Sequence, residues 1–242
     1  MRTFTILYEE YKVSLLTEEN TFHCDIRSNT EPLIHEEIKS FLKDNSNSSF
    51  LHAPDFTHAV VGLSHMAMPN AVFEQAHAAA YHSRMYGTLN STHELHNTLS
   101  ANAQVQLIHA QPTWLNGFVA AQFNGEPIHS MHQLLLSSLQ RNTGYTIDLH
   151  CFTNQCYLGV YRDQTLWYSD FFEFTLIDDI IYMLVNMLNQ YKLSTEGALL
   201  RLSSTHPTIQ PALINAYLER IEPLNLLAIE SRDIRTLFDH IV

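Results

Sequence analysis

The clearest pattern in the sequence runs from Gly144 to Lys192, where three short apolar runs precede one long amphipathic segment. β-Branched and aromatic residues dominate the three runs, and polar turns of three and four residues separate them. This pattern predicts three strands joined as antiparallel hairpins. The following segment has apolar residues every three or four positions, which predicts a helix. The expected strands are 145–151, 155–161 and 166–172, and the expected helix is 175–191.

The start and the buried face of that helix follow from the same pattern. Thr175 is suited to an N-cap, and Asp178 would place a carboxylate in the first turn, where the helix dipole favours it. Ile180, Leu184 and Leu188 share one helical face. We therefore expect these three side chains to pack against the sheet formed by the preceding strands.

The chain continues with a strand, a helix, a continuous apolar run and a final helix. Thr205 and Pro207 are suited to the N-cap and first turn of the first of these helices. The continuous apolar run is typical of a buried parallel strand. The resulting order βββαβαβα is that of a ribonuclease H-like domain. The expected elements are the strand 198–202, the helix 207–220, the strand 224–229 and the helix 232–242.

The N-terminal half shows the same order with additional segments. The similarity of LLTEENTF to GVYRDQTLW, each read as strand, acidic turn and strand, suggests an internal duplication. We predict an α/β fold with mixed sheets and two similar ribonuclease H-like halves, 1–141 with insertions and 142–242. The junction is placed at 141–144. Expected strands are 3–8, 11–16, 21–26, 57–63, 105–109 and 126–129; expected helices are 31–43, 70–86, 112–123 and 131–140, with an irregular polar segment at 87–102.

Composition narrows the classes of function. The net charge is −12 with 13 basic residues and no basic cluster, which disfavours nucleic acid and anionic membranes as partners. No apolar run reaches the roughly 18 residues of a membrane helix, so no membrane span is expected. The N-terminus has no signal-peptide pattern, and an odd count of three cysteines without a CxxC motif is typical of a reducing compartment. We therefore expect a cytoplasmic protein.

The segment IDLHCFTNQCYLGVYRDQTLWYSDFFEF resembles the opening hairpin of the second domain in actin-like ATPases and sugar kinases. The chain also resembles an uncharacterised family from Bacteroides-type bacteria with a degenerate actin-like fold. The stretches MPNAVFE and FEFTLIDDIIYML carry this second resemblance. Both resemblances imply the duplicated, ribonuclease H-like fold of the actin-like ATPases.

The first resemblance implies a nucleotide cleft and a set of residues to line it. Asp148 matches the carboxylate that orients the metal ion or attacking water near the phosphates, and it is the candidate catalytic residue. Thr153 matches the hydroxyl residue of the phosphate loop. Ser203 and Ser204 stand where the family has its adenosine-side turn. We regard this set as a vestigial nucleotide site.

Structural interpretations of the same residues compete with the nucleotide site. Asp148 can be an acid at a strand end, solvated or capping a turn, and the segment with Ser203 and Ser204 can be a strand end before a capped helix. We prefer these interpretations because phosphate binding needs small residues that allow close backbone approach. The family's glycines are replaced by the 150–152 segment His-Cys-Phe, and the equivalent N-terminal turn carries Glu9 and Glu10.

Other chemistry has weaker support in the sequence. The fifteen histidines include close pairs, such as His93 with His96 and His129 with His132, but no cysteine partner or HExxH motif accompanies them. No metal site is predicted. The aromatic run from Trp167 to Phe174 is either a partner surface or, in our preferred interpretation, one face of a sheet core.

We therefore expect a non-catalytic actin-like scaffold that binds an unidentified protein partner and needs no cofactor. The alternative is an actin-like ATPase or phosphotransferase with an unorthodox site, for which ATP and Mg²⁺ would be the ligands. A histidine-based metal binder is a third interpretation, which depends on convergence of ligands in the fold.

Overall fold

A computed structural model describes most of the chain, and its secondary structure divides into two compact units within residues 1–134 and 135–237. The boundary predicted between residues 141 and 142 falls outside the described residues and stays a prediction. So do most of the helix predicted at 232–242 and the first part of the strand predicted at 224–229. The described residues are 4–17, 20–45, 56–61, 63–99, 105–140, 144–163, 165–192, 196–206, 208–220 and 228–233.

The first unit contains a five-stranded mixed sheet in the order β3-β2-β1-β4-β8. Strand β1 pairs antiparallel with β2 and parallel with β4, and Ile6 and Leu7 on β1 are both fully buried. Burial on both faces explains why this strand reads as a continuous apolar run. The elements of the sheet and its helices are β1 Phe4–Tyr8, β2 Lys12–Leu16, β3 Thr21–Asp25, α1 Glu31–Asp44, β4 Phe56–Val60, α3 Thr113–Gln122 and β8 Ile128–Ser130. The next helix, α4 Met131–Gln140, contains the boundary between the two units.

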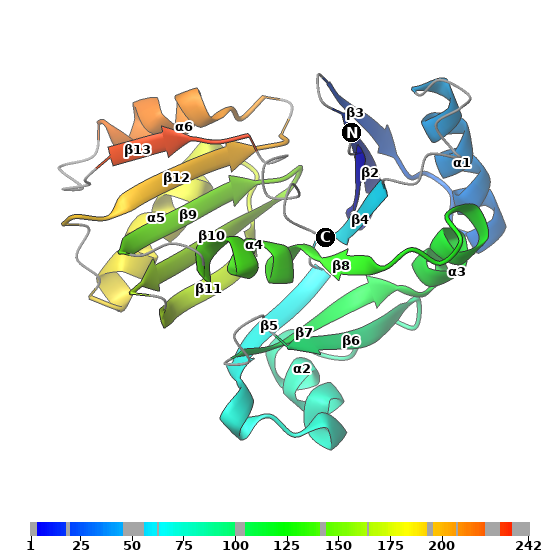
Figure 1. Cartoon of the computed structure of the whole chain (residues 1–242), viewed down its shortest axis with the longest axis horizontal. Helices are drawn as coiled ribbons and strands as arrows, with labels where there is room; N and C mark the ends of the chain where they lie inside the picture. The colour runs from blue at the N-terminus through cyan, green and yellow to red at the C-terminus, as the bar shows by residue number, and fades with distance from the viewer. Residues whose placement is uncertain are drawn as a thin grey trace. The chain divides into compact units, whose positions relative to one another are not determined.

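The helices α1 and α3 share one hydrophobic core with this sheet (Figure 1). Their buried residues, including Ile38 and Phe118, cluster with Ile6, Val13 and Val60 of the strands. Between β4 and α3 the chain inserts a separate three-stranded sheet in the order β5-β7-β6. Its elements are β5 Leu63–Pro69, η2 Asn70–Val72, η3 Gln75–His77, α2 Ala78–Tyr86, β6 His93–Leu99 and β7 Val105–Pro112.

The second unit repeats the mixed topology, with the strand order β11-β10-β9-β12-β13. Helices α5 and α6 lie over one face of the sheet (Figure 1) and share a core with β9, β10 and β12. The structure thus confirms two mixed five-stranded sheets, each led by an antiparallel hairpin. The elements are β9 Tyr145–Cys151, β10 Gln155–Arg162, β11 Thr165–Glu173, α5 Ile177–Gln190, β12 Leu199–Ser204, α6 Pro211–Leu218 and β13 Ala228–Ser231.

Two predictions in the inserted segment are wrong. The stretch 87–102 was expected to be irregular, but it contains strand β6, which pairs antiparallel with β7. Its sequence HELHNTL lacks apolar alternation because β6 is an edge strand whose side chains all stay partly exposed. The helix expected over 70–86 begins only at Ala78 and is preceded by two 3₁₀ turns.

Two helix starts also differ from expectation. The N-cap of α5 is Leu176, not Thr175, and the Asp179 carboxylate accepts hydrogen bonds from the backbone N–H groups of both residues at 2.8 Å. Helix α6 begins at Pro211, four residues later than the predicted Pro207. Before it, His206 Nδ1 accepts from the backbone N–H groups at 208 and 209, which holds a turn in place of the first helical turn.

Ile180, Leu184 and Leu188 are buried in the core of the second unit, as predicted. Leu184→Ala should lower the free energy of unfolding by about 2–5 kcal/mol, since the deleted methyl groups leave a cavity. Tyr182→Ala on the same helix is the control, because Tyr182 is 67% exposed; its effect should stay within about 0.5 kcal/mol. Urea unfolding followed by circular dichroism measures both. Equal losses in the two variants would show that the buried face is misassigned.

Candidate functional site

The two leading hairpins have the same turn geometry. Glu9 N–H donates to the Lys12 carbonyl at 2.8 Å, and Phe152 N–H donates to the Gln155 carbonyl at 2.8 Å. Each turn therefore has two residues at its tip. The tips are Glu10 and Tyr11 in the first unit, and Thr153 and Asn154 in the second.

The same correspondence extends to the neighbouring parallel strand. Val61 N–H donates to the Tyr8 carbonyl at 2.9 Å, and Thr205 N–H donates to the Cys151 carbonyl at 2.9 Å. These bonds link the end of the leading strand to the residue that follows the next parallel strand in each unit. The backbone frame around both turns is thus duplicated, so their chemical differences lie in the side chains.

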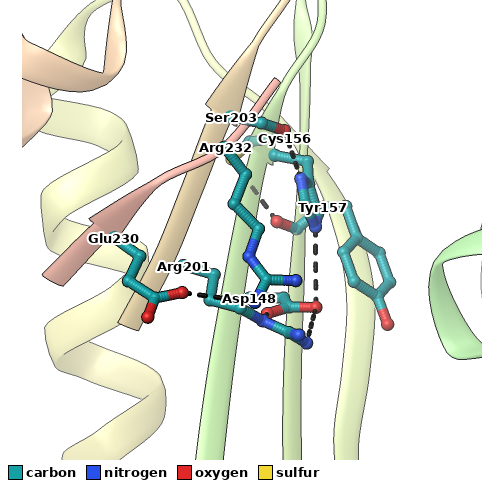
Figure 2. A network of polar contacts seen from close by, with 8 residues as sticks. Asp148, Cys156, Tyr157, Arg201, Ser203, Glu230 and Arg232 are labelled. Carbon is teal, nitrogen blue, oxygen red and sulfur yellow. Dashed lines mark hydrogen bonds and ion pairs between the residues drawn. The ribbon is translucent and has the colours of Figure 1, made fainter. Parts of the chain in front are cut away.

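Asp148 lies in the middle of β9, three residues before the strand ends, and is 1% exposed. It pairs in register with Arg201 of β12, which is also 1% exposed. Arg201 Nη2 donates to Asp148 Oδ2 at 2.7 Å, and Arg201 Nε donates to Oδ1 (Figure 2). Such a bidentate pair satisfies both carboxylate oxygens with fixed geometry. Asp148 is therefore neither solvated nor part of a turn.

The electrostatic surroundings keep this carboxylate ionised. Burial alone would raise the pKa of Asp148, but interactions with His150 and Arg201 outweigh burial and lower the pKa below its usual value. The His150 Nε2 atom lies 3.6 Å from Asp148 Oδ2. Removal of Arg201 would leave a negative charge in a dehydrated interior, which is costly.

A second polar pair lies beside the first on the same face of the sheet. His150 and Ser203 are in register on β9 and β12, and the imidazole Nδ1 shares a hydrogen bond with the Ser203 hydroxyl. Tyr157 on β10 stacks on His150, with ring centroids 5.9 Å apart. A Cβ at Gly159 would lie 2.5 Å from the Tyr157 hydroxyl oxygen, so glycine at this position allows the tyrosine ring to cover the backbone.

The order of Ser203, His150 and Asp148 resembles the nucleophile, base and acid of a hydrolase triad. Burial argues against hydrolase chemistry, because all three side chains are essentially inaccessible to solvent. A substrate carbonyl needs to approach the serine hydroxyl closely, which burial prevents. Asp148 is also bound to Arg201 through both oxygens. The arrangement is best understood as a buried polar network.

The network reaches the edge of the sheet at β13. Arg201 pairs in register with Glu230, and Arg232 Nη2 donates to Glu230 Oε2 at 3.2 Å (Figure 2). These two outer residues are partly exposed, with side chains 39% and 46% accessible for Arg232 and Glu230. The sign of the charge therefore alternates along the series Asp148, Arg201, Glu230 and Arg232, from the interior to the surface.

The predicted site residues are only partly brought together. Asp148 and Ser203 are connected through His150. Thr153 lies at the tip of the β9–β10 turn, and the Ser204 hydroxyl at the end of β12 accepts a hydrogen bond from the His206 N–H at 3.0 Å. Whether any of the four contacts a nucleotide stays a prediction.

Sequence reasoning missed two members of the network, His150 and Arg201. A signal for them exists in the alternation Asp-x-His on β9 and Arg-x-Ser on β12, because residues two apart on a strand share a face. The parallel register that joins the two strands is what turns this pattern into a network.

Other candidate chemistry is weakly supported by the structure. Across the described ranges, no group of three or more His, Cys, Asp or Glu side chains is placed to hold a metal ion. Cys151 and Cys156 are both buried with their Sγ atoms 3.5 Å apart, and they are free thiols. None of the described helices has the length and apolar character needed to cross a bilayer.

Comparisons with known proteins identify a family and a fold. The sequence profile of a family described as "Protein of unknown function (DUF3822)" matches residues 4–217. A search of curated proteins gave no match. A solved structure from Bacteroides thetaiotaomicron, a protein with an actin-like ATPase fold and unknown function, is similar at a TM-score of 0.71 and 14% identity, covering 96% of this chain and 90% of that one. This likeness confirms the predicted actin-like fold.

Two further solved structures are similar over most of their length. The cytoplasmic domain of EpsL, an inner membrane component of the Vibrio cholerae type II secretion system, has a TM-score of 0.46 and 9% identity, covering 98% of this chain and 92% of that one. A chain of the PilM–PilN type IV pilus biogenesis complex has a TM-score of 0.45 and 11% identity, covering 99% and 93%.

The ion pair should make Arg201 critical for stability. Arg201→Met leaves the Asp148 carboxylate buried without its cation, and we expect a loss of about 3–5 kcal/mol. Combining Arg201→Met with Asp148→Leu removes both charges, so the double variant should recover most of that loss. Denaturant unfolding measures all three proteins. A double variant no more stable than Arg201→Met would contradict the ion-pair explanation.

Acid should weaken the ion pair. Because the pKa of Asp148 is lowered in the folded protein, its contribution is complete above the unfolded value of about 3.9 and is lost as pH falls through the folded value. The wild-type protein should therefore lose stability relative to the Asp148→Leu, Arg201→Met double variant as the pH is lowered below about 4. Urea midpoints measured from pH 7 to pH 3 test this, and a constant difference would argue against it.

Proposed function

We propose that this chain, which belongs to the DUF3822 family of proteins of unknown function, is a non-catalytic actin-like protein that binds a protein partner in the cytoplasm. The observation that carries the proposal is the buried ion pair of Asp148 with Arg201. In the ATPases that the sequence resembles, the matching carboxylate serves the metal ion or water at the phosphates. Here both of its oxygens are occupied.

Releasing Asp148 for catalysis would require breaking that pair. A metal ion would have to displace the Arg201 guanidinium from Asp148. The guanidinium would then stay buried without a counter-charge. Breaking a buried pair costs about 3–5 kcal/mol. The position in mid-strand adds a second obstacle, because the carboxylate lies three residues from the strand end, away from the turn where phosphates would approach.

The first turn is unfavourable for a polyanion. Glu9 and Glu10 carry two carboxylates at this position, and Glu9 is buried. Two like unit charges 4 Å apart repel by about 1 kcal/mol in water and about 4 kcal/mol near a protein surface. A triphosphate brings several such charges, so repulsion outweighs any gain from the backbone N–H groups of the turn.

The second turn lacks the small residues that phosphate loops use. Its tip is Thr153 and Asn154, and Phe152 before it is fully buried. Glycine permits backbone N–H groups to approach a ligand closely because it has no side chain. The side chains at this tip occupy that space.

An actin-like ATPase or phosphotransferase with an unorthodox site is the alternative, and one observation favours it. The hydroxyl residues Thr153 and Ser204 lie at the carboxyl ends of the parallel neighbours β9 and β12. Ligands of open α/β sheets bind at this end of the strands. A ligand that contacts these two residues would leave the ion pair of Asp148 with Arg201 intact.

Calorimetric titration with Mg²⁺–ATP separates the two functions. We expect a dissociation constant above about 1 mM, equivalent to less than about 4 kcal/mol of binding free energy. Any trace hydrolysis should be the same in Thr153→Ala and in Asp148→Ala, the latter measured where circular dichroism shows it folded. Micromolar affinity, with hydrolysis abolished by these substitutions, would replace the scaffold with the ATPase.

A further inference from the structure

The first unit contains a cavity of about 360 Å³ beside its leading turn. It lies among the β1–β2 turn, the segment from β3 into α1, the loop before β6 and the start of α3, all of which belong to that unit. Its volume is about twelve times the roughly 30 Å³ share of one water molecule. It is also within the range of about 300–1,000 Å³ that is typical of ligand pockets.

The charged groups in its wall are negative. Glu10 comes from the tip of the β1–β2 turn, and Glu31 is the first residue of α1. None of the described residues that line the cavity is a lysine or an arginine. His93 also lines it, and burial lowers the pKa of this imidazole more than Glu10 raises it, so His93 is neutral at pH 7.

The uncharged part of the wall suits an organic cation. Trp114 and Tyr11 contribute aromatic rings, which attract cations through their negative faces. Ser28, Asn29 and Asn90 contribute oxygen acceptors. A guanidinium has five N–H donors and no acceptor, so these oxygen acceptors can satisfy it.

The N-termini of α1 and α3 lie at this cavity, and their positive dipole ends disfavour a cation. This effect is smaller than that of the two carboxylates. Each helix end acts as about half a positive charge and contributes roughly 0.3–1 kcal/mol. Glu31 already lies in the first turn of α1, where it offsets that dipole. The first N–H of α3 is bonded, since Thr113 N–H donates to the Thr92 carbonyl at 3.0 Å. Two full carboxylate charges therefore set the sign of the field.

We infer that this cavity binds a lysine or arginine side chain of a protein partner, held between the Glu10 and Glu31 carboxylates and the Trp114 and Tyr11 rings. This inference rests on the proposed scaffold function and names the chemistry of the partner. The protein's charge of −12 favours a basic partner over an acidic one. The turn that would cradle phosphate in an actin-like ATPase thus supplies a carboxylate to a site for the opposite charge.

Tryptophan fluorescence can report on the cavity directly, because the chain has only two tryptophans. In a Trp167→Phe background, Trp114 in the cavity wall is the only tryptophan, and selective excitation of tryptophan isolates its emission from that of the tyrosines. The probes are blocked eight-residue alanine–glycine peptides with one central arginine, and the same peptides with citrulline, which has the shape of arginine without its charge. The arginine peptide should give a saturable change that weakens with added salt. Citrulline should require at least about tenfold more peptide.

Substitutions then test the residues. Glu10→Gln combined with Glu31→Gln should weaken arginine-peptide binding about tenfold. Glu36→Gln is the matched control, since it removes the same charge from α1 at a residue that does not line the cavity, and binding should be unchanged. Circular dichroism confirms the fold of each variant. Equal binding of arginine and citrulline peptides, or no effect of the double substitution, would overturn the site.

The source of the cation is tested in the same assay. Free arginine and spermidine should bind more weakly than the peptide, because they lack the backbone that a partner would contribute at the cavity mouth. Equal or tighter binding of spermidine would overturn a protein partner in favour of a small polyamine. Calorimetry with Mg²⁺–ATP on the same Trp167→Phe protein tests the scaffold function separately. Tight ATP binding would contradict the scaffold function, whereas absent peptide binding with weak ATP binding would contradict only the cation site.

Discussion

An ionised carboxylate in the interior of a sheet constrains everything packed around it. Asp148 and Arg201 are both fully buried, and neither can be dehydrated alone without a penalty of several kcal/mol. The pair therefore fixes the parallel register of β9 and β12, since a shift by one residue would place each charge on the opposite, apolar face. That face is the core under α5, which has no partner for either charge.

The buried ion pair is found in only one of the two units, although the leading strands of both units have the same hydrogen-bonded arrangement. The strand-end hydrogen bonds show that β1 and β4 correspond to β9 and β12. Under that correspondence, the position of Asp148 is taken by Thr5 and that of Arg201 by Thr57, which pair in register and are both buried. The fold thus accommodates a neutral pair in one unit and a charged pair in the other. The charged pair is therefore not needed to form the topology.

Elements that depend on local sequence patterns could be predicted from the sequence, whereas contacts between residues far apart in the chain could not. The five-stranded sheets follow from local patterns, because strands such as β1 and β9 are short runs rich in aromatic and β-branched residues, bounded by their own turn signals. Strand β6 was missed because it is an edge strand without apolar alternation. The start of α6 was missed because a side-chain hydrogen bond of His206 holds a turn in place of the first helical turn. Arg201 reads locally as a single charge in an apolar strand. Only its register with a residue 53 positions away makes it the partner of Asp148.

In the proposed function, the charge of the leading turn decides which ligands the first unit accepts. Backbone geometry there is the same as in the second unit, so the frame itself still offers N–H groups at the turn. Glu10 reverses the sign of the potential at this position and lines the cavity beside it. Glu10 is only half-buried, so salt partly screens this effect. Under the proposed function, a change of side chains at one two-residue turn disfavours a polyanion and favours a cation, while the hydrogen-bonded frame of the fold stays intact.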